Sequence, residues 1–167
     1  FKRVLNMKKG FFSKEYTAEF SDGKKISVRS KRFLSIVNDE LGVIKFSIEP
    51  MNFDGKMEVL ADLDADIINQ DSNYDEKFWN EVEKSVSIFP YVIAETKKTK
   101  FRVCTAMNMI TEFDGKEIHA DNIMKIEKEK YVALKFELPL KKNTITRLFK
   151  FAAVTSSLYH KNEELSS

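Results

Sequence analysis

The chain has 167 residues, a length typical of one domain, and its 28 basic and 26 acidic residues leave a net charge of only +2. Nucleic-acid-binding modules usually carry clustered Lys and Arg and a pI above about 9, whereas this sequence has a pI near 8.5. Hydrophobic residues make up 43% of the chain, which excludes a disordered protein, and no apolar run approaches the ~18 residues that cross a bilayer.

Apolar and polar residues alternate along most of the chain, which is the pattern of strands with one buried and one wet face. The alternation predicts eight or more strands and no helix-sized crossovers between them. Two packed sheets would bury both apolar faces, so the sequence predicts an all-β antiparallel sandwich. The regular segments are 12–20, 26–29, 44–48, 57–65 and 132–138, and less regular ones cover 101–110 and 144–154.

Three Asp-Gly dipeptides, each followed by Lys, separate alternating segments at residues 22–23, 54–55 and 114–115. Asp-Gly favours tight two-residue turns because both of its residues tolerate positive φ. Each dipeptide therefore predicts a β-hairpin.

Two segments depart from the strand pattern. Over 69–88, Phe78, Val82 and Val86 recur at helical spacing behind a weak capping box at Ser72 and Asp75, which fits either a short helix or a long ordered loop. The polar segment 158–167 resembles the start of a helix or linker. We predict a single domain over 1–167, with a linker beginning near residue 155.

Few residues suggest chemistry. Asp62, Asp64 and Asp66 lack the Gly and Glu that an EF-hand calcium loop requires, so they are interpreted as the wet face of a strand. The single cysteine, Cys104, excludes an intramolecular disulfide and is interpreted as a packing residue. His119 is expected on the surface after a turn, and His160 in the tail. Short basic clusters near 97–102 and 128–130 are interpreted as wet faces because acidic residues accompany them.

The segment 71–79 is more informative because it holds the only tryptophan among amide and carboxylate side chains. Sugars stack on aromatic faces while their hydroxyls pair with such polar groups. The segment predicts a carbohydrate or domain contact through Asn73, Tyr74, Phe78 and Trp79. The alternative is that Phe78 and Trp79 simply plug the edge of the sandwich.

Several strings resemble the N-terminal domain of glycoside hydrolase family 65, whose members include maltose, kojibiose and trehalose phosphorylases. They cover residues 32–36, 41–55 and 59–68, together with an entry segment at 5–12 in which Asn6 replaces the usual Asp, and the segment 69–79. The resemblance extends over about residues 3–80. None of these strings is a catalytic motif.

The resemblance implies a super-sandwich of the galactose-mutarotase type, which packs on an (α/α)6 barrel outside this chain. That barrel supplies the catalytic Glu and the site for inorganic phosphate, the co-substrate of an inverting reaction on α-glucosidic disaccharides. The resemblance leaves open whether the parent enzyme is such a phosphorylase or a related hydrolase. The resemblance also implies that the first strands of the sandwich lie outside this chain. We therefore expect no catalytic, cofactor or metal residue here.

The expected partners are the protein's own barrel, a disaccharide contact and a second copy in a homodimer, in the cytoplasm, with neither nucleic acid nor membrane as a partner. An exposed apolar patch should mark the docking surface and drive self-association of the isolated chain. Two other functions are open: a stand-alone carbohydrate-binding module that uses Tyr74, Phe78 and Trp79, and a protein-interaction sandwich.

Overall fold

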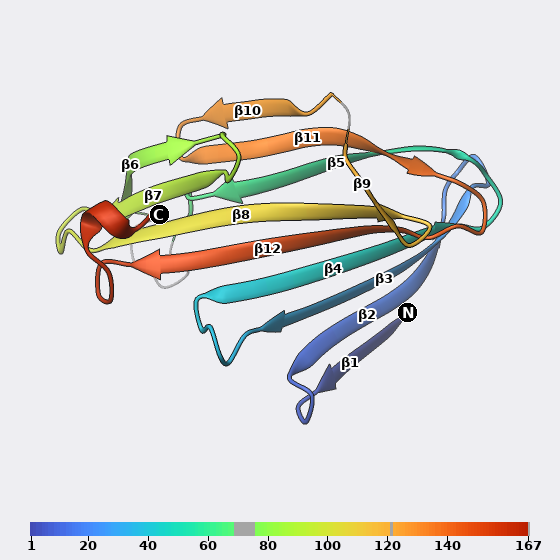
Figure 1. The fold of residues 1–167 in the computed structure, drawn as a ribbon, viewed down its shortest axis with the longest axis horizontal. Helices are drawn as coiled ribbons and strands as arrows, with labels where there is room; N and C mark the ends of the chain where they lie inside the picture. The colour runs from blue at the N-terminus through green and yellow to red at the C-terminus, as the bar shows by residue number, and fades with distance from the viewer. Residues whose placement is uncertain (69–75, 121, 167) are drawn as a thin grey trace. The chain divides into compact units, whose positions relative to one another are not determined.

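The computed structural model describes residues 1–68, 76–120 and 122–166, which form an antiparallel β-sandwich of two sheets (Figure 1). The all-β prediction is therefore confirmed. Within the described residues the helical element is a single 3-10 turn, η1, at Asn162–Glu164. None of the helical structure in these ranges is long and apolar enough to span a membrane.

The larger sheet contains nine strands in the order β1-β2-β3-β4-β12-β8-β7-β6, and β9 pairs with β8 off this path. Strands adjacent in sequence are mostly adjacent in the sheet, while β12 enters between β4 and β8. The bounds are β1 Lys2–Asn6, β2 Phe11–Glu19, β3 Lys25–Leu34, β4 Leu41–Pro50, β6 Trp79–Ser85, β7 Tyr91–Thr96, β8 Arg102–Phe113, β9 Lys116–Ile118 and β12 Thr146–Ser156.

The smaller sheet has three strands in the order β10-β11-β5. Its bounds are β5 Gly55–Asp64, β10 Met124–Lys128 and β11 Tyr131–Leu140. Alternation in β11 is clear in its second half, where Phe136, Leu138 and Leu140 are buried and Glu137 is exposed. The alternation predicted over 132–138 is thus confirmed at Phe136, Glu137 and Leu138.

The chain divides into two compact units, each with its own buried side chains. The first unit comprises Phe1–Val59, Met109–Ile123 and Phe136–Phe151, and its most buried residues include Val28, Pro50, Thr111, Phe136, Leu138 and Thr146. The second unit comprises Leu60–Asn108, Met124–Lys135 and Ala152–Ser167, and buries Ala61, Leu63, Val92, Ile93, Cys104, Met107, Val132, Ala133 and Leu165. The single domain expected from the sequence stays a prediction.

Two of the three Asp-Gly hairpins are confirmed. The dipeptide at 114–115 joins β8 to β9 with positive φ at both residues (51° and 76°), as a type I′ turn requires. The dipeptide at 22–23 joins β2 to β3, and only Gly23 has a positive φ, at 80°. Its loop is closed by backbone hydrogen bonds at both Phe20 and Lys24.

The third predicted hairpin is wrong. The dipeptide at 54–55 connects β4 of the larger sheet to β5 of the smaller one, so its flanking strands are not partners. Asp54 instead accepts a hydrogen bond from the backbone N–H of Lys142 at 2.6 Å, in the connection between β11 and β12. The carboxylate thus stabilises a loop that is distant in sequence, and not its own turn.

The helical alternative for 69–88 is also wrong where the segment is described, because Trp79–Ser85 forms strand β6. A register shift between Glu81 and Glu83 interrupts its pairing with β7. Val82 is the unpaired residue at this irregularity and is 42% exposed, whereas Val86 is buried, so the helically spaced apolar residues do not share one buried face. Ser72 and Asp75, the proposed cap, lie outside the described residues.

The stability of the first unit should depend strongly on Leu138, which is 1% exposed, and hardly on Leu34, which is 76% exposed. We expect Leu138→Ala to lower the free energy of unfolding by about 2–5 kcal/mol, since it removes buried methyl groups and leaves a cavity. Leu34→Ala should change it by less than about 0.5 kcal/mol. Urea unfolding followed by circular dichroism measures both, and equal effects would contradict the assignment of Leu138 to the core.

Candidate functional site

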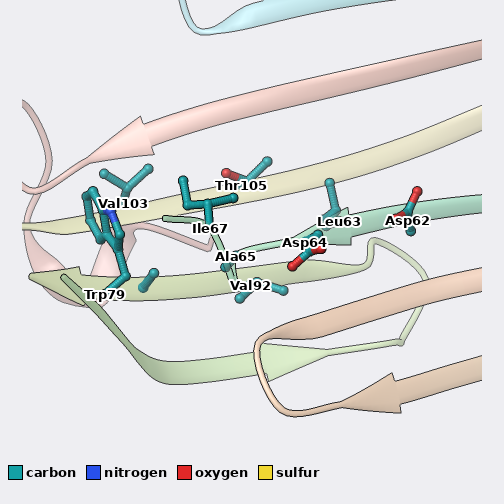
Figure 2. Close-up of a pocket in the computed structure, with 10 residues that line it drawn as sticks. Asp62, Leu63, Asp64, Ala65, Ile67, Trp79, Val92, Val103 and Thr105 are labelled. Atoms are coloured by element: carbon teal, nitrogen blue, oxygen red, sulfur yellow. The ribbon is translucent and has the colours of Figure 1, made fainter. Parts of the chain in front are cut away.

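An apolar pocket of about 310 Å³ lies in the second unit, at the lower end of the ~300–1,000 Å³ typical of ligand sites (Figure 2). Its walls come from the end of β5 and the first residue of β6, and its floor from the paired strands β7 and β8. In that floor Val92 lies opposite Thr105, and Ala94 opposite Val103. The remaining lining residues are Asp62, Leu63, Asp64, Ala65, Ile67 and Trp79.

Trp79 provides the aromatic wall. It pairs with Thr96 of β7, so strand alternation places its side chain on the same face as Ala94. Figure 2 shows its indole ring beside Val103. The Nε1 atom is buried and has no hydrogen-bond partner among the described residues. Because a buried donor without an acceptor costs about 1–3 kcal/mol, a ligand oxygen beside Nε1 would bind favourably.

The two carboxylates that line the pocket already have protein partners. Asp62 interacts with the Tyr131 hydroxyl, whose pKa is raised by burial and then by the negative charge of Asp62. Asp64 accepts a hydrogen bond from the backbone N–H of Asp66 at 2.8 Å. These contacts fix the end of β5, and they show that the two groups are held as structural acceptors.

Asp66, the third aspartate of the run, forms ion pairs with Lys77 at 2.5 Å and with Lys130 at 3.4 Å. The hydrogen bond from Lys77 is the main reason why the pKa of Asp66 lies below its usual value. Glu81 on β6 pairs with Lys84 at 2.8 Å and also accepts a hydrogen bond from the backbone N–H of Lys130. The acidic run therefore ties the end of β5 to the turn between β10 and β11.

The structure brings together only part of the predicted contact set. Trp79 lines the pocket, while Phe78 is half-buried outside the lining and its carbonyl accepts a hydrogen bond from the backbone N–H of Lys97 at 2.9 Å. Asn73 and Tyr74 lie outside the described residues. The lining from β5, β7 and β8 was missed because only its apolar alternation was visible in the sequence.

Cys104 lies in a small cluster with Ile93 and Leu165, against which Tyr91 packs. Burial raises the pKa of its thiol to about 11, which makes the thiolate scarce at neutral pH. The Thr155 hydroxyl donates to the carbonyl of Leu165 at 2.7 Å and anchors the C-terminal segment there. The packing interpretation of Cys104 is consistent with this environment.

Two further candidates occupy ordinary positions. His119 is exposed after the β8–β9 turn, as expected. In the basic cluster near 97–102, Arg102 and Lys100 both form ion pairs with Glu95, at 2.9 and 3.2 Å. These hydrogen bonds, with Arg102 as the larger cause, lower the pKa of Glu95, so Lys100 and Arg102 belong to an ion-paired surface.

The first unit contains a second concavity, of about 430 Å³, which no sequence pattern predicted. We call it the basic groove. It lies on one face of β2, β3, β4 and β12, and its lining includes Arg29, Lys31, Lys45 and Arg147, together with Phe11, Ser13, Glu15, Ser30, Ser47 and Ile145. The only local signal was Arg29 and Lys31 two residues apart on one strand. The other cations come from distant segments.

The model of the glycosyl hydrolase family 65 N-terminal domain matches residues 1–167. The chain belongs to this family, as its N-terminal domain. The resemblance deduced from the sequence strings is thereby confirmed.

Two curated relatives match nearly all of the chain. A maltose phosphorylase of Bacillus subtilis (strain 168) is 32% identical over the whole chain, and an alpha,alpha-trehalose phosphorylase of Thermoanaerobacter brockii is 28% identical over 94% of it. The chain spans only 21% of the length of either relative. A solved structure that bears the name "Putative kojibiose phosphorylase from human microbiome" has the same fold, with a TM-score of 0.81 and 18% identity over 98% of this chain and 20% of that one.

Proposed function

We propose that this family 65 N-terminal domain is a non-catalytic module of a cytoplasmic, inverting phosphorylase of α-glucosidic disaccharides. In this proposal the module packs on and supports an (α/α)6 catalytic barrel that lies outside the chain. The observation that carries the proposal is the family match over all 167 residues, combined with relatives of which this chain is only 21%. The remaining four-fifths of such a protein would hold the catalytic groups and the phosphate site.

The first unit offers a surface suited to such packing, which we call the aromatic face. The register of β1, β2, β3 and β4 places Leu5, Phe12, Tyr16, Ile44 and Phe46 on one side of the sheet. Leu5, Tyr16 and Phe46 are 67%, 39% and 37% exposed. Contiguous exposed apolar groups of this kind are typical of interaction surfaces, which supports docking of the rest of the protein here.

Cations stack on the rings of the aromatic face. The Arg3 guanidinium lies 4.6 Å from the centre of the Phe1 ring, and the Arg32 guanidinium lies 4.9 Å from that of Phe12. Tyr16 and Phe1 form a tilted pair with centroids 6.2 Å apart. A partner surface that combines apolar and acidic groups would complement this face.

The proposal predicts that the native polypeptide is several times larger than the 19.4 kDa chain. An antibody raised against the chain should detect the larger product in a lysate of the source. That product should release glucose 1-phosphate from maltose, trehalose or kojibiose in a phosphate-dependent reaction, and the 167-residue chain alone should not. Release by the isolated chain, or a native product near 19.4 kDa, would contradict the proposal.

Without its partner, the aromatic face should drive self-association of the 167-residue chain, including a homodimer. We expect Leu5→Ser to lower the average mass in sedimentation velocity, because it removes exposed apolar surface from that face. Leu158→Ser is a matched control, since Leu158 is 68% exposed but lies in the second unit. Identical sedimentation of both variants and the parent chain would contradict the assignment of the aromatic face as a docking surface.

The buried indole N–H of Trp79 favours a second candidate function, which is contact with a saccharide in the apolar pocket. A sugar ring could stack on the indole while a hydroxyl oxygen accepts from Nε1. This contact would serve either the assembled enzyme or a stand-alone carbohydrate-binding module.

Trp79 is the only tryptophan, so its fluorescence reports directly on the pocket. Added maltose should shift the emission maximum by an amount that saturates with concentration. Trp79→Phe keeps an aromatic ring but loses the donor, and should lower the affinity for maltose, measured by calorimetry, by about 2–10-fold. Tyr159→Phe also loses one donor, from a side chain that is 80% exposed and outside the pocket, and should bind normally. An emission maximum that does not change on addition of maltose, glucose or trehalose would exclude the saccharide contact.

A further inference from the structure

The basic groove places four cations on one face of neighbouring strands. Arg29 and Lys31 come from β3, Lys45 from β4 and Arg147 from β12. The sheet order makes β4 the strand between β3 and β12, so the four side chains belong to one continuous surface. Three carboxylates accompany them: Glu15 lines the groove, Glu49 lines a small adjoining cavity with Arg29 and Ser47, and Glu112 pairs with Arg147 at 3.1 Å. Positive groups therefore outnumber negative ones.

The strand register opposes two like charges. Lys31 and Lys45 are direct partners in the β3–β4 pair and point to the same face. Like charges in this arrangement destabilise a sheet. Here they are drawn apart: the Lys31 ammonium lies 3.8 Å from the centre of the Phe11 ring, and the Lys45 ammonium lies 5.1 Å from that of Phe149. Phe11 belongs to β2 and Phe149 to β12, so the two ring contacts lie toward opposite edges of this four-strand surface.

Arg29 lies two residues from Lys31 on the same face of β3. It is opposite Glu15 on β2 and Ser47 on β4. It is exposed, and within the described residues no ion pair or hydrogen bond engages its guanidinium. A guanidinium presents several donors in a planar fork that suits phosphate oxygens.

We propose that the basic groove binds a phosphate group, either as the free ion or carried by a small sugar. The cations would neutralise the phosphate, Ser13 and Ser47 would donate hydrogen bonds, and Glu15 would accept from a sugar hydroxyl. The groove volume of about 430 Å³ suits a small molecule and falls within the usual range for such ligands. This site goes beyond the proposed function, in which the phosphate co-substrate binds to the barrel outside this chain.

Isothermal titration of the 167-residue chain with inorganic phosphate, glucose 6-phosphate and glucose, at constant ionic strength, tests the proposal. We expect saturable binding of the two phosphates and none of glucose. Arg29→Gln and Lys31→Gln should each raise the dissociation constant of phosphate roughly 3–10-fold. Glu112→Gln releases Arg147 from its ion pair and should lower this dissociation constant. Tighter binding of glucose 6-phosphate than of phosphate would identify a sugar phosphate as the ligand, and equal binding would identify the free ion.

The same strands supply matched controls on the opposite face. Arg32 is on β3 like Arg29, and Lys14 is stacked on a phenylalanine ring like Lys31, with 5.7 Å between its ammonium and the Phe12 ring centre. Arg32→Gln and Lys14→Gln remove the same charges and should leave phosphate affinity unchanged. Equal weakening by all four variants would show unspecific attraction and overturn the proposal. Absence of saturable phosphate binding would overturn it as well, whatever the outcome of the phosphorolysis assay.

Discussion

The alternation of side chains along long strands is the constraint on which every surface of this domain depends. In β2 and β3, each step of one residue moves a side chain from one face of the sheet to the other. Phe12 and Tyr16 therefore join the aromatic face, while Ser13 and Glu15, their neighbours, line the basic groove. One sheet thus presents two chemically different surfaces, one for each of the two contacts proposed above.

Charged side chains have two distinct roles in the structure. Around the end of β5, Asp66 and Glu81 engage Lys77, Lys84 and Lys130, and so connect segments that are distant in sequence. Surface ion pairs contribute only about 0–1 kcal/mol each, so their effect is mainly to position loops. In the basic groove, by contrast, the lysines stack on rings and Arg29 has no ionic partner among the described residues. That difference distinguishes a structural charge network from a candidate binding surface.

Local sequence signals were correct where the structure they indicate is itself local. The alternation around residues 132–138 predicted β11, and the turn chemistry of residues 114–115 predicted a type I′ hairpin. The same chemistry failed at residues 54–55, because the two flanking strands belong to different sheets. The apolar spacing of 78–86 imitated a helix because it includes Val82, the unpaired and exposed residue at a register shift inside β6.

The sequence by itself determined the all-β class, most strand positions and, through its family strings, the membership in family 65. These properties depend on short-range periodicity and on ungapped motifs, which a single chain displays directly. Only the tertiary structure decided that Trp79 meets the end of β5 and the β7–β8 floor, or that Arg29 shares a groove with Arg147. These contacts depend on which distant strands pair and in which register. Pairing of this kind is set by long-range packing after loop closure, and alternation alone leaves it open.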